Sequence, residues 1–484
     1  MTTASNELAT AQRTALRAFQ AYAAVGIAVF LLMMLVGVTM RGTHAQWLGV
    51  NSAVFYQLMT LHGAGMVGTS GLAGAAVMWY FLRRHVALSN AMFVALLGLS
   101  LLGVVLIIGA IAIGGFAGGW TFLYPLPAKS VGLWGPHAAA AYVVGLLLIG
   151  VGFLLFYLDC ALALIRQYGN LARSLGLNRL FSGSLEDAPP PAVVASTMVV
   201  IVNVCGILAG AVVLVMTLVN LYVPVIVFDA LLMKNLIFFF GHVFINAAIY
   251  MAVIGVYEVL PRYTGRPWKT TRPFLWSWAA VTLLVMAVYP HHLLMDFVMP
   301  QWAAVLGQVL SYASGIPVLL VTTYGALVNI YRSGIKWDLP SRLLVFGLFG
   351  WSIGVVPAIV DATIKVNLVM HNTLWVPGHF HLYLLLGLLP MIVGTILYAA
   401  TRTAWSESAL DRAAFWIFGT AGLVFCLTFL AGGRSGVPRR FAEHDLPWVP
   451  LAQIATVAGL IVLGAAIVLG IRTLMRLPRV DLNA

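Results

Sequence analysis

Long apolar stretches dominate the chain and constrain its fold more than any other feature. Stretches long enough to cross a bilayer, which takes about 20 residues as a helix, recur along its whole length. They begin near residues 18, 52, 90, 134, 193, 227, 274, 301, 341, 372, 412 and 449. A helix satisfies all its own backbone hydrogen bonds in lipid. The sequence therefore predicts an all-α, polytopic membrane protein with about twelve transmembrane helices.

The charge distribution supports a membrane topology and excludes a nucleic-acid partner. Only 8% of the residues are charged, and the formal net charge is +12. A nucleic-acid binder clusters its basic residues on one face, whereas here Lys and Arg stand at the ends of apolar runs. Most of them fall in connections on the side of the N-terminus, so the positive-inside rule predicts both termini in the cytoplasm. We expect a multi-pass protein of the plasma or inner membrane.

The apolar pattern indicates one membrane domain. Residues 1–17 are polar and lack the short apolar core and cleavage site of a signal peptide, so we expect a retained cytoplasmic lead-in. Residues 18–476 form the predicted transmembrane domain, and residues 477–484 a cytoplasmic tail. The longest polar interruption, residues 166–191, is predicted to be a cytoplasmic loop because apolar helices resume directly after it.

Histidines within the apolar segments are the most informative residues. Ionisable groups at membrane depth are costly and usually have a function. One such histidine could simply pack between helices, but seven lie in or at the edge of predicted spans: His62, His242, His291, His292, His371, His379 and His381. The remaining ones carry less information: His44, His85 and His444 are expected in loops, and His137 stays undecided.

Two spacings suggest how these histidines are used. His379 and His381 are two residues apart, which places them about 200° apart on one helix. One helix could therefore ligate two cofactors. His291 and His292 lie at the end of the seventh span, where a helix breaks, and with His242 they could form a three-imidazole site. Imidazole suits copper, iron and zinc alike.

Five motifs together resemble subunit I of the haem-copper oxygen reductase superfamily. They are LHG at 61–63, GH at 241–242, YPHH at 289–292, HNTLWVPGHFH at 371–381 and VPRR at 437–440. The last two are most similar to the B-type oxidases. The resemblance implies two haems, of a or b type, and one non-haem metal, copper or iron. It implies these ligands: His62 and His381 for a low-spin haem, His379 for a high-spin haem, His242, His291 and His292 for the metal, and His371, Arg439 and Arg440 for haem propionates.

The sequence departs from the oxidase pattern at Asn246. In A- and B-type oxidases a tyrosine cross-linked to the first metal-binding histidine stands four residues after it, and here that residue is Asn246. Nitric oxide reductases of the superfamily also lack this tyrosine, because joining two NO molecules takes two electrons and no further oxidising equivalent. Asn246 could ligate the metal, hydrogen-bond bound NO or bridge to a neighbouring helix. Tyr250 and Tyr289 lie nearby, outside the family position.

A second departure concerns proton supply. Tyr257 matches a residue of the B-type proton path, but Val318 and Val321 stand where that path has serine and threonine, so we expect the path to be interrupted. Proton entry from the outer side would need an acidic residue there. The candidates are Asp296 and, as weaker ones, Glu443 and Asp445.

These observations predict the catalytic subunit of a respiratory reductase, with NO reduction to N2O and water preferred. The alternative is a B-type cytochrome c oxidase that uses Tyr250 or Tyr289 as its tyrosine donor. A channel or transporter built on Lys234, Asp361 and Lys365 is disfavoured by the ordered histidines.

The electron-entry centre is expected outside this chain. The chain has no CxxCH motif, and its three cysteines, Cys160, Cys205 and Cys426, form no pair. We therefore expect a partner subunit with a cupredoxin-like copper centre or a cytochrome c domain. A cytochrome c or a small copper protein would be the donor.

Overall fold

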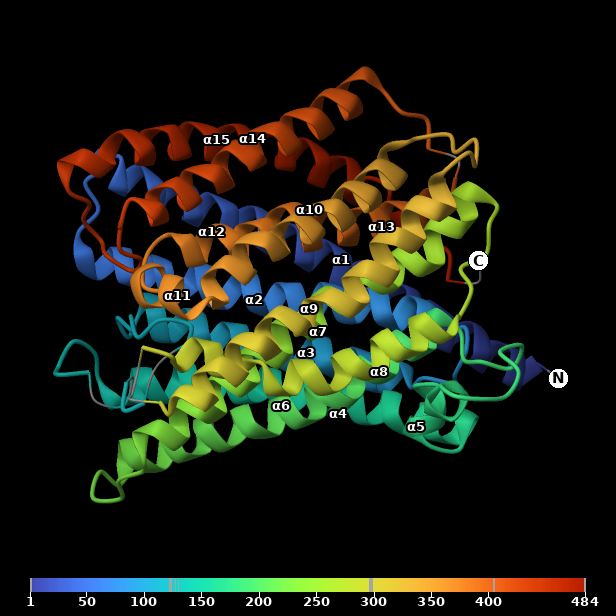
Figure 1. Cartoon of the computed structure of the whole chain (residues 1–484), viewed down its shortest axis with the longest axis horizontal. Helices are drawn as coiled ribbons and strands as arrows, with labels where there is room; N and C mark the ends of the chain where they lie inside the picture. The colour runs from blue at the N-terminus through green and yellow to red at the C-terminus, as the bar shows by residue number, and fades with distance from the viewer. Residues whose placement is uncertain are drawn as a thin grey trace.

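The protein is a bundle of long, roughly parallel helices (Figure 1). The computed structural model describes residues 2–121, 124–126, 128, 130–295, 299–403 and 405–482, with side chains from residue 10 onward. Among these residues there is no β-strand, and twelve helical segments are long and apolar enough to span a membrane. The predicted fold class is confirmed, and the spans begin close to the predicted positions except that the first helix already starts at Thr2.

The spanning helices follow one another with short connections. They are α1 (Thr2–His44), α2 (Ser52–Leu82), α3 (Asn90–Ala112), α4 (Pro136–Tyr168), α6 (Pro191–Tyr222), α7 (Ala230–Thr264), α8 (Arg272–Ala287), α9 (Gln301–Ile330), α10 (Leu339–Ala362), α12 (Trp375–His381) continued by α13 (Leu389–Thr401), α14 (Ala409–Arg434) and α15 (Val449–Leu474). The short helices α5 (Leu171–Ser174) and α11 (Ile364–Met370) lie in connections.

Local sequence signals set several of these helix starts. Asn51 and Asp229 accept hydrogen bonds from the first turns of α2 and α7, as N-cap residues do. Asp338 and Ser341 form a reciprocal capping box at the start of α10. Because the exposed peptide groups of these helix ends are satisfied locally, the sequence determines where α7 and α10 enter the bundle.

Regular helix is interrupted at the two segments that carry five of the seven histidines predicted in or at the edge of the spans. After α8 the chain forms a 3-10 turn, Tyr289–Leu293, which contains Pro290. The tenth span consists of α12, a π-helical segment (Leu382–Leu388) and α13, and the short helix α11 precedes it. Irregular backbone at membrane depth occurs where it is buried in protein or lines a cavity, and π-helical turns are frequent at functional sites. The predicted break after the seventh span is confirmed.

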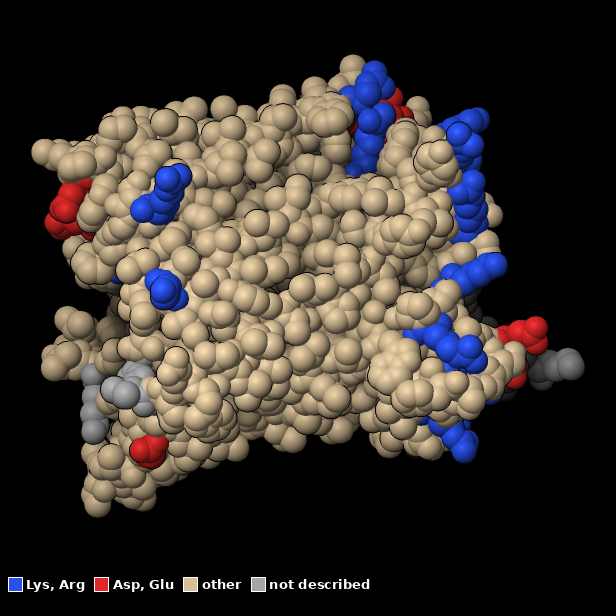
Figure 2. Space-filling model, viewed as in Figure 1, with Lys and Arg blue, Asp and Glu red and all other residues tan. Residues whose placement is uncertain are grey.

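Basic residues mark one end of the bundle. In Figure 2 most Lys and Arg side chains gather at the right-hand end, where both chain termini lie in Figure 1. This distribution fits the topology expected from the sequence. The end that carries the termini is called the inner end below, and the opposite end the outer end.

Candidate haem and metal centre

Three imidazoles converge where α7 meets the 3-10 turn after α8. His242 comes from α7, and His291 and His292 from the turn. One ring nitrogen from each of the three histidines lies within 4.8 Å of the other two. Among the described residues, these three histidines form the cluster that could hold a metal ion. Imidazole nitrogens bound about 2.0–2.1 Å from one ion lie at most about 4 Å apart. A small rotation of the side chains therefore suffices to close the site, and these residues fit the predicted metal.

A hydrogen bond sets the orientation of His291. Its Nδ1 lies 2.7 Å from the carbonyl oxygen of Val288 and 2.9 Å from Oγ of Ser311. The N–H at Nδ1 donates to the carbonyl, which leaves the lone pair on Nε2. A metal-binding histidine typically donates its other ring N–H in this way.

Asn246 contacts the triad directly, from one turn further along α7. Its Nδ2 lies 2.8 Å from the main-chain oxygen of His242 and 3.0 Å from the ring Nδ1 of the same residue. The Asn246 side chain also lines the central cavity. Its amide is thus turned onto His242 and its own helix, so that it contacts a predicted ligand. Whether it ligates the metal or hydrogen-bonds a bound gas stays a prediction.

His62 and His381 face each other across the bundle with a gap that suits one iron atom. Their ring centroids are 6.3 Å apart, with 22° between the ring planes. Bonds of about 2 Å to a shared metal, with about 1.1 Å from nitrogen to ring centre, give a separation of about 6 Å. Each Nδ1 lies 2.7 Å from a backbone oxygen, of Met33 and Pro377 respectively, so each Nε2 keeps a lone pair that could bind a metal.

A glycine on α1 makes room for this pair. A Cβ atom at Gly37 would lie 2.9 Å from Cε1 of the His62 ring, closer than real Cβ contacts. The α1 surface therefore admits the His62 ring only with glycine at this position. The facing pair His62 and His381, with the space left by Gly37, fits the low-spin haem site that the resemblance implies.

His379 points away from His381, as the two-residue spacing predicts. His379 packs against Phe380 and Tyr383, whereas His381 packs against Phe425 and Phe429. His379 is buried, and its Nδ1 has no hydrogen-bond partner among the described residues. One helix thus presents an imidazole to each of two sites.

One largely apolar cavity joins all these imidazoles. It has a volume of about 550 Å³, within the usual range for ligand pockets. The predicted ligands on its wall are His62, His242, His291, His292, His379 and His381. A continuous cavity reaching both sides of α12 fits two haems that lie close together, with the metal triad facing one of them.

Two of the three predicted propionate residues line this cavity. Arg439 and Arg440 lie on its wall, where guanidinium groups can pair with carboxylates. Arg439 donates to Oδ1 of Asn372 at 3.2 Å, and Arg440 to Oγ1 of Thr121 at 3.3 Å. His371, the third, does not line the cavity.

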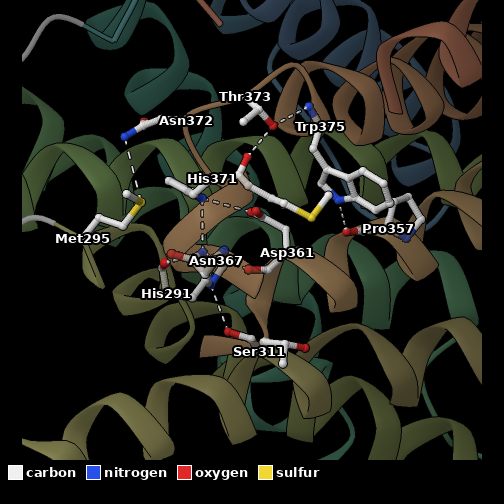
Figure 3. A network of polar contacts seen from close by, with 12 residues as sticks. His291, Met295, Ser311, Pro357, Asp361, Asn367, His371, Asn372, Thr373 and Trp375 are labelled. Carbon is white, nitrogen blue, oxygen red and sulfur yellow. Dashed lines mark hydrogen bonds and ion pairs between the residues drawn. The ribbon is translucent and has the colours of Figure 1, made fainter. Parts of the chain in front are cut away.

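His371 instead belongs to a buried polar network behind the metal triad (Figure 3). Its Nδ1 lies 3.0 Å from Oδ2 of Asp361. Nδ2 of Asn367 lies 2.8 Å from the main-chain oxygen of Asp361 and 3.4 Å from that of His291. Asp361 and Asn367 were not expected at this site, because ten residues and a helix break separate Asp361 from His371 in the sequence.

Neither nearby tyrosine makes a hydrogen bond to the triad among the described residues. The hydroxyl of Tyr289 donates to Oδ1 of Asn235 at 3.1 Å. Tyr250 packs edge-on against Trp278 and Trp351, and its side chain lines the cavity. Tyr250 is therefore the better placed of the two for a role in the cavity.

The inner polar path has a hydroxyl that the sequence reading missed. The hydroxyls of Tyr257 and Thr322 are joined by a hydrogen bond of 2.6 Å. Val318, which stands where the B-type path has a polar residue, is fully buried on the same helix as Thr322. Thr322 follows Val321 directly, and only its place on α9 shows that it reaches Tyr257.

Three acidic residues were candidates for proton entry from the outer side. Asp296 lies outside the described residues, and Glu443 and Asp445 are exposed.

His44 and His444 are both buried. His444 lies in a loop, as expected, whereas His44 is the last residue of α1. Their rings are stacked, with centroids 3.7 Å apart and 4° between the planes. Nη1 of Arg41 donates to Nδ1 of His44 at 3.1 Å, and Nε2 of His44 donates to the main-chain oxygen of Phe441 at 2.9 Å. The stack buries these side chains because it joins the end of α1 to the loop that carries the two arginines.

Of the remaining histidines, His85 lies 3.7 Å from Glu258 and is partly exposed. His137 is exposed and contacts the hydroxyl of Tyr222 at 3.1 Å. Neither lines the cavity.

Acid should destabilise the protein through His444. Burial and the nearby Arg41 lower its pKa from 6.5 to about 4. The folded state then resists a proton that the unfolded chain takes up, so stability is lost as the pH falls from about 6.5 towards 4, by about 2 kcal/mol at pH 5. The variant His444→Phe keeps an aromatic stack and should lose this acid sensitivity.

This prediction is checked by thermal unfolding at pH 7 and pH 5, followed through tryptophan fluorescence. The exposed His137, changed to Phe, is the control. Equal acid sensitivity in the His444→Phe variant and the unmodified protein would contradict the prediction.

Comparison with known proteins agrees with this geometry. The family model of cytochrome c and quinol oxidase polypeptide I matches residues 17–461. Cytochrome c oxidase subunit 1 of Synechocystis is 24% identical over 444 residues, which cover 86% of this chain and 75% of that protein. Haem-copper oxidase subunit I+III of Aeropyrum pernix is 25% identical over 50% of this chain and 29% of its own length.

A further relative matches in sequence, and a solved structure matches in fold. Cytochrome c oxidase polypeptide 1 of Halobacterium salinarum is 26% identical over 52% of this chain and 43% of its own length. The matches to the Aeropyrum and Halobacterium proteins thus span less than half of their length. In fold, the chain is similar to a haem-copper terminal oxidase solved as a dimer by cryo-electron microscopy, with a TM-score of 0.79, 18% identity, and coverage of 96% of this chain and 84% of that chain. The chain belongs to the cytochrome c and quinol oxidase polypeptide I family, subunit I of the haem-copper oxidases.

Proposed function

We propose that this membrane-bound oxidoreductase reduces two NO molecules, with two electrons and two protons, to N2O and water. The observation that carries the proposal is Asn246, whose amide contacts the predicted metal ligand His242. At this position an O2-reducing enzyme of the A or B type needs a phenol as a source of an electron and a proton. An amide cannot supply either, and NO reduction does not require them from the protein.

The cofactor assignment rests on the resemblance of the motifs, and the geometry of the imidazoles supports it. His62 and His381 would hold the low-spin haem, His379 the high-spin haem, and His242, His291 and His292 the non-haem metal. Bound there, these groups would supply electrons and Lewis-acid positions for the gas. The type of the haems and the choice between copper and iron belong to this proposal.

The chain's own residues hold and orient this centre. Val288 and Ser311 fix the ring of His291, and Asn246 fixes that of His242. The mostly apolar wall excludes water, which strengthens electrostatic interactions inside the cavity. Arg439 and Arg440 would pair with haem carboxylates at its outer edge. Placing two NO molecules in one such cavity favours N–N bond formation through proximity.

Electrons would enter from a partner subunit at the outer end. Arg439 and Arg440 lie in the loop that His44 ties to α1, and they line the same cavity as His62 and His381. A donor domain with a copper centre or a cytochrome c docking on this end would lie close to the low-spin site. We propose a cytochrome c or a small copper protein as the soluble donor, and the plasma or inner membrane as the location, with both termini in the cytoplasm.

Reduction of O2 to water is the second candidate. The relatives that match are named as haem-copper and cytochrome c oxidases, and the side chain of Tyr250 lines the cavity. In this case Tyr250 would take the place of the missing tyrosine.

Gas consumption by the purified complex with an artificial reductant distinguishes the two functions. NO and O2 are supplied to the same preparation, and N2O is measured. We expect rapid NO consumption with N2O release and slow O2 reduction. Faster reduction of O2 to water would overturn the proposal, and Tyr250→Phe would then test the substitute tyrosine.

The variant Asn246→Leu should lower NO turnover about 10-fold or more while both haem spectra stay intact. The substitution removes the amide that fixes the His242 ring, and contacts that support metal ligands typically contribute about 10–100-fold. Turnover and optical spectra are compared in the same preparations. Asn235→Leu is the matched control, because this asparagine lies on the same helix and bonds to Tyr289. Unchanged turnover in Asn246→Leu would reduce Asn246 to a packing role.

A further inference from the structure

We propose that Trp405, Arg472 and Arg476 form a binding site for the phosphate group of an anionic phospholipid at the inner end of the bundle. The site lies where the connection before α14 meets the end of α15. Figure 2 shows Lys and Arg side chains gathered at this end. The inference does not depend on the proposed function, because none of the three residues lines the cavity that carries the histidines.

Both arginines lie over the indole ring of Trp405. The guanidinium carbon of Arg476 is 5.4 Å from the ring centre, and that of Arg472 is 5.6 Å from it. The two residues are four positions apart at the end of α15, so they lie about one helical turn from each other on the same side. Two positive charges held this close repel each other unless anions lie beside them.

The charge of Arg472 is neutralised within the protein. Its Nε and Nη2 donate to the two carboxylate oxygens of Asp411 at 2.7 and 2.9 Å, and the Asp411 side chain is fully buried. Arg476 forms no ion pair with any carboxylate in the part of the chain that the structure describes, and the contact found for it is the indole of Trp405. Its charge therefore remains uncompensated.

The surroundings of Trp405 add positive charge instead of removing it. Glu407, two residues after Trp405, is already shared between Arg342 at 3.3 Å and Arg412 at 3.5 Å. The N-terminus of α14, which begins at Ala409, contributes a partial positive charge as well. A ligand that balances this site must therefore be an anion.

The indole of Trp405 offers a further hydrogen-bond donor. Trp405 is only 8% exposed, and its Nε1 has no partner among the described residues. A buried N–H without an acceptor is costly, and one oxygen of a phosphate could accept from it. The planar guanidinium of Arg476 suits the other oxygens, because its N–H groups match the geometry of phosphate.

The exposed surface beside the arginines suits an acyl chain. Ile467, Ile471 and Met475 recur every four residues and are 41%, 50% and 68% exposed. They form an apolar row beside Arg472 and Arg476 that runs from the inner end towards the middle of the span. Basic residues at the cytoplasmic surface attract anionic lipids, and tryptophan is typical of the membrane boundary. A free phosphate ion would gain nothing from the apolar row, so the site fits a phospholipid.

Lipid binding to the intact complex tests the proposal. The complex is stripped of lipid in detergent, and its integrity is verified by gel filtration and its optical spectrum. Phosphatidylglycerol is titrated in, and the lipids bound per complex are counted by native mass spectrometry. A phosphatidylglycerol with a photoreactive acyl chain is then cross-linked, and the labelled peptide is identified. Phosphatidylcholine, whose phosphate is balanced by a choline cation, and inorganic phosphate are used in separate titrations.

We expect a tightly bound phosphatidylglycerol that cross-links to residues 467–475. Arg476→Gln should weaken its binding about 10-fold or more, the size of a hydrogen bond to a charged group. Trp405→Phe keeps an aromatic ring but removes the N–H, and should weaken binding about 5-fold. Arg479→Gln is the matched control, because it removes one positive charge from an exposed arginine three residues further along. It should bind the lipid as tightly as the unmodified complex does.

Other outcomes would overturn the proposal. Unchanged binding in both Arg476→Gln and Trp405→Phe would remove these residues from the site. An equal loss in Arg479→Gln would show that the net charge of the inner end suffices without a built site. Phosphatidylcholine that binds as tightly would contradict the anionic headgroup. Displacement of phosphatidylglycerol by inorganic phosphate would show that the site takes the free ion, and the lipid assignment would fail.

Discussion

Replacing His242 with alanine is expected to lower gas reduction at least about a thousandfold, equivalent to about 4 kcal/mol in the activation barrier. The triad nitrogens lie within 4.8 Å of one another, and His242 is the only one of the three from α7. Without it the two histidines of the 3-10 turn remain, and two imidazoles from one short segment cannot enclose the ion. The non-haem metal should be lost, while both haems stay bound to His62, His379 and His381.

The measurement combines turnover with metal and haem content. Metal analysis should show one non-haem ion fewer per chain, and the haem spectra should be those of the unmodified complex. The control is His137→Ala, which removes an exposed histidine that contacts Tyr222 and lies outside the cavity wall. Turnover within about tenfold of the unmodified complex after His242→Ala, a loss of less than about 1.4 kcal/mol, would show that this histidine is not a ligand.

The histidine arrangement could be predicted because periodicity and helix breaks act over short distances. A two-residue spacing on one helix separates His379 and His381 by about 200°, and the structure gives them different neighbours. Pro290 removes a backbone donor, so the helix had to end before His291 and His292. Such local rules need no knowledge of how the helices pack.

Contacts between distant segments could not be predicted in the same way. His444 lies in a loop as expected and His44 ends α1, but their burial as a stack between α1 and the loop that carries Arg439 and Arg440 was not predicted. Asp361 meets His371 only because the chain turns between α10 and α11. Thr322 reaches Tyr257 through the packing of α9 on α7. In each case the sequence offered a polar residue, but not the direction in which it points.

The π-helical segment had no sequence signal either. It extends from Leu382 to Leu388, directly after His381, and consists mostly of leucine, which forms ordinary α-helix as readily. Packing against α10 explains the π-helical segment better than leucine propensity does. Gly350 of α10 and Gly387 of the π-helical segment let the two backbones approach closely, with Leu386 against Gly350 and Trp351 against Gly387. Tertiary contact therefore determines the backbone next to both proposed haem sites.

The variant His381→Leu should lose one of two haems and keep the other. The substitution removes one of the two imidazoles that face each other at 6.3 Å, and the proposed low-spin haem would depend on both of them. His379 points to the other side of α12 and keeps its contact with Tyr383. Haem content should therefore fall from two to one per chain, with the low-spin spectrum gone and carbon monoxide binding to the high-spin haem retained.

Loss of the low-spin haem should also slow electron delivery from the natural donor while leaving the high-spin site able to react. Turnover with the natural donor should fall about 100-fold or more, equivalent to about 2.7 kcal/mol, since an electron must then cross the gap between donor and high-spin site without a carrier. Dithionite should still reduce the remaining haem. Phe425→Leu, which alters a ring packed against His381 without removing a ligand, is the control. If both haems disappear together in His381→Leu but not in the control, the two iron sites are not held independently by opposite sides of α12, and the assignment of His379 fails with that of His381.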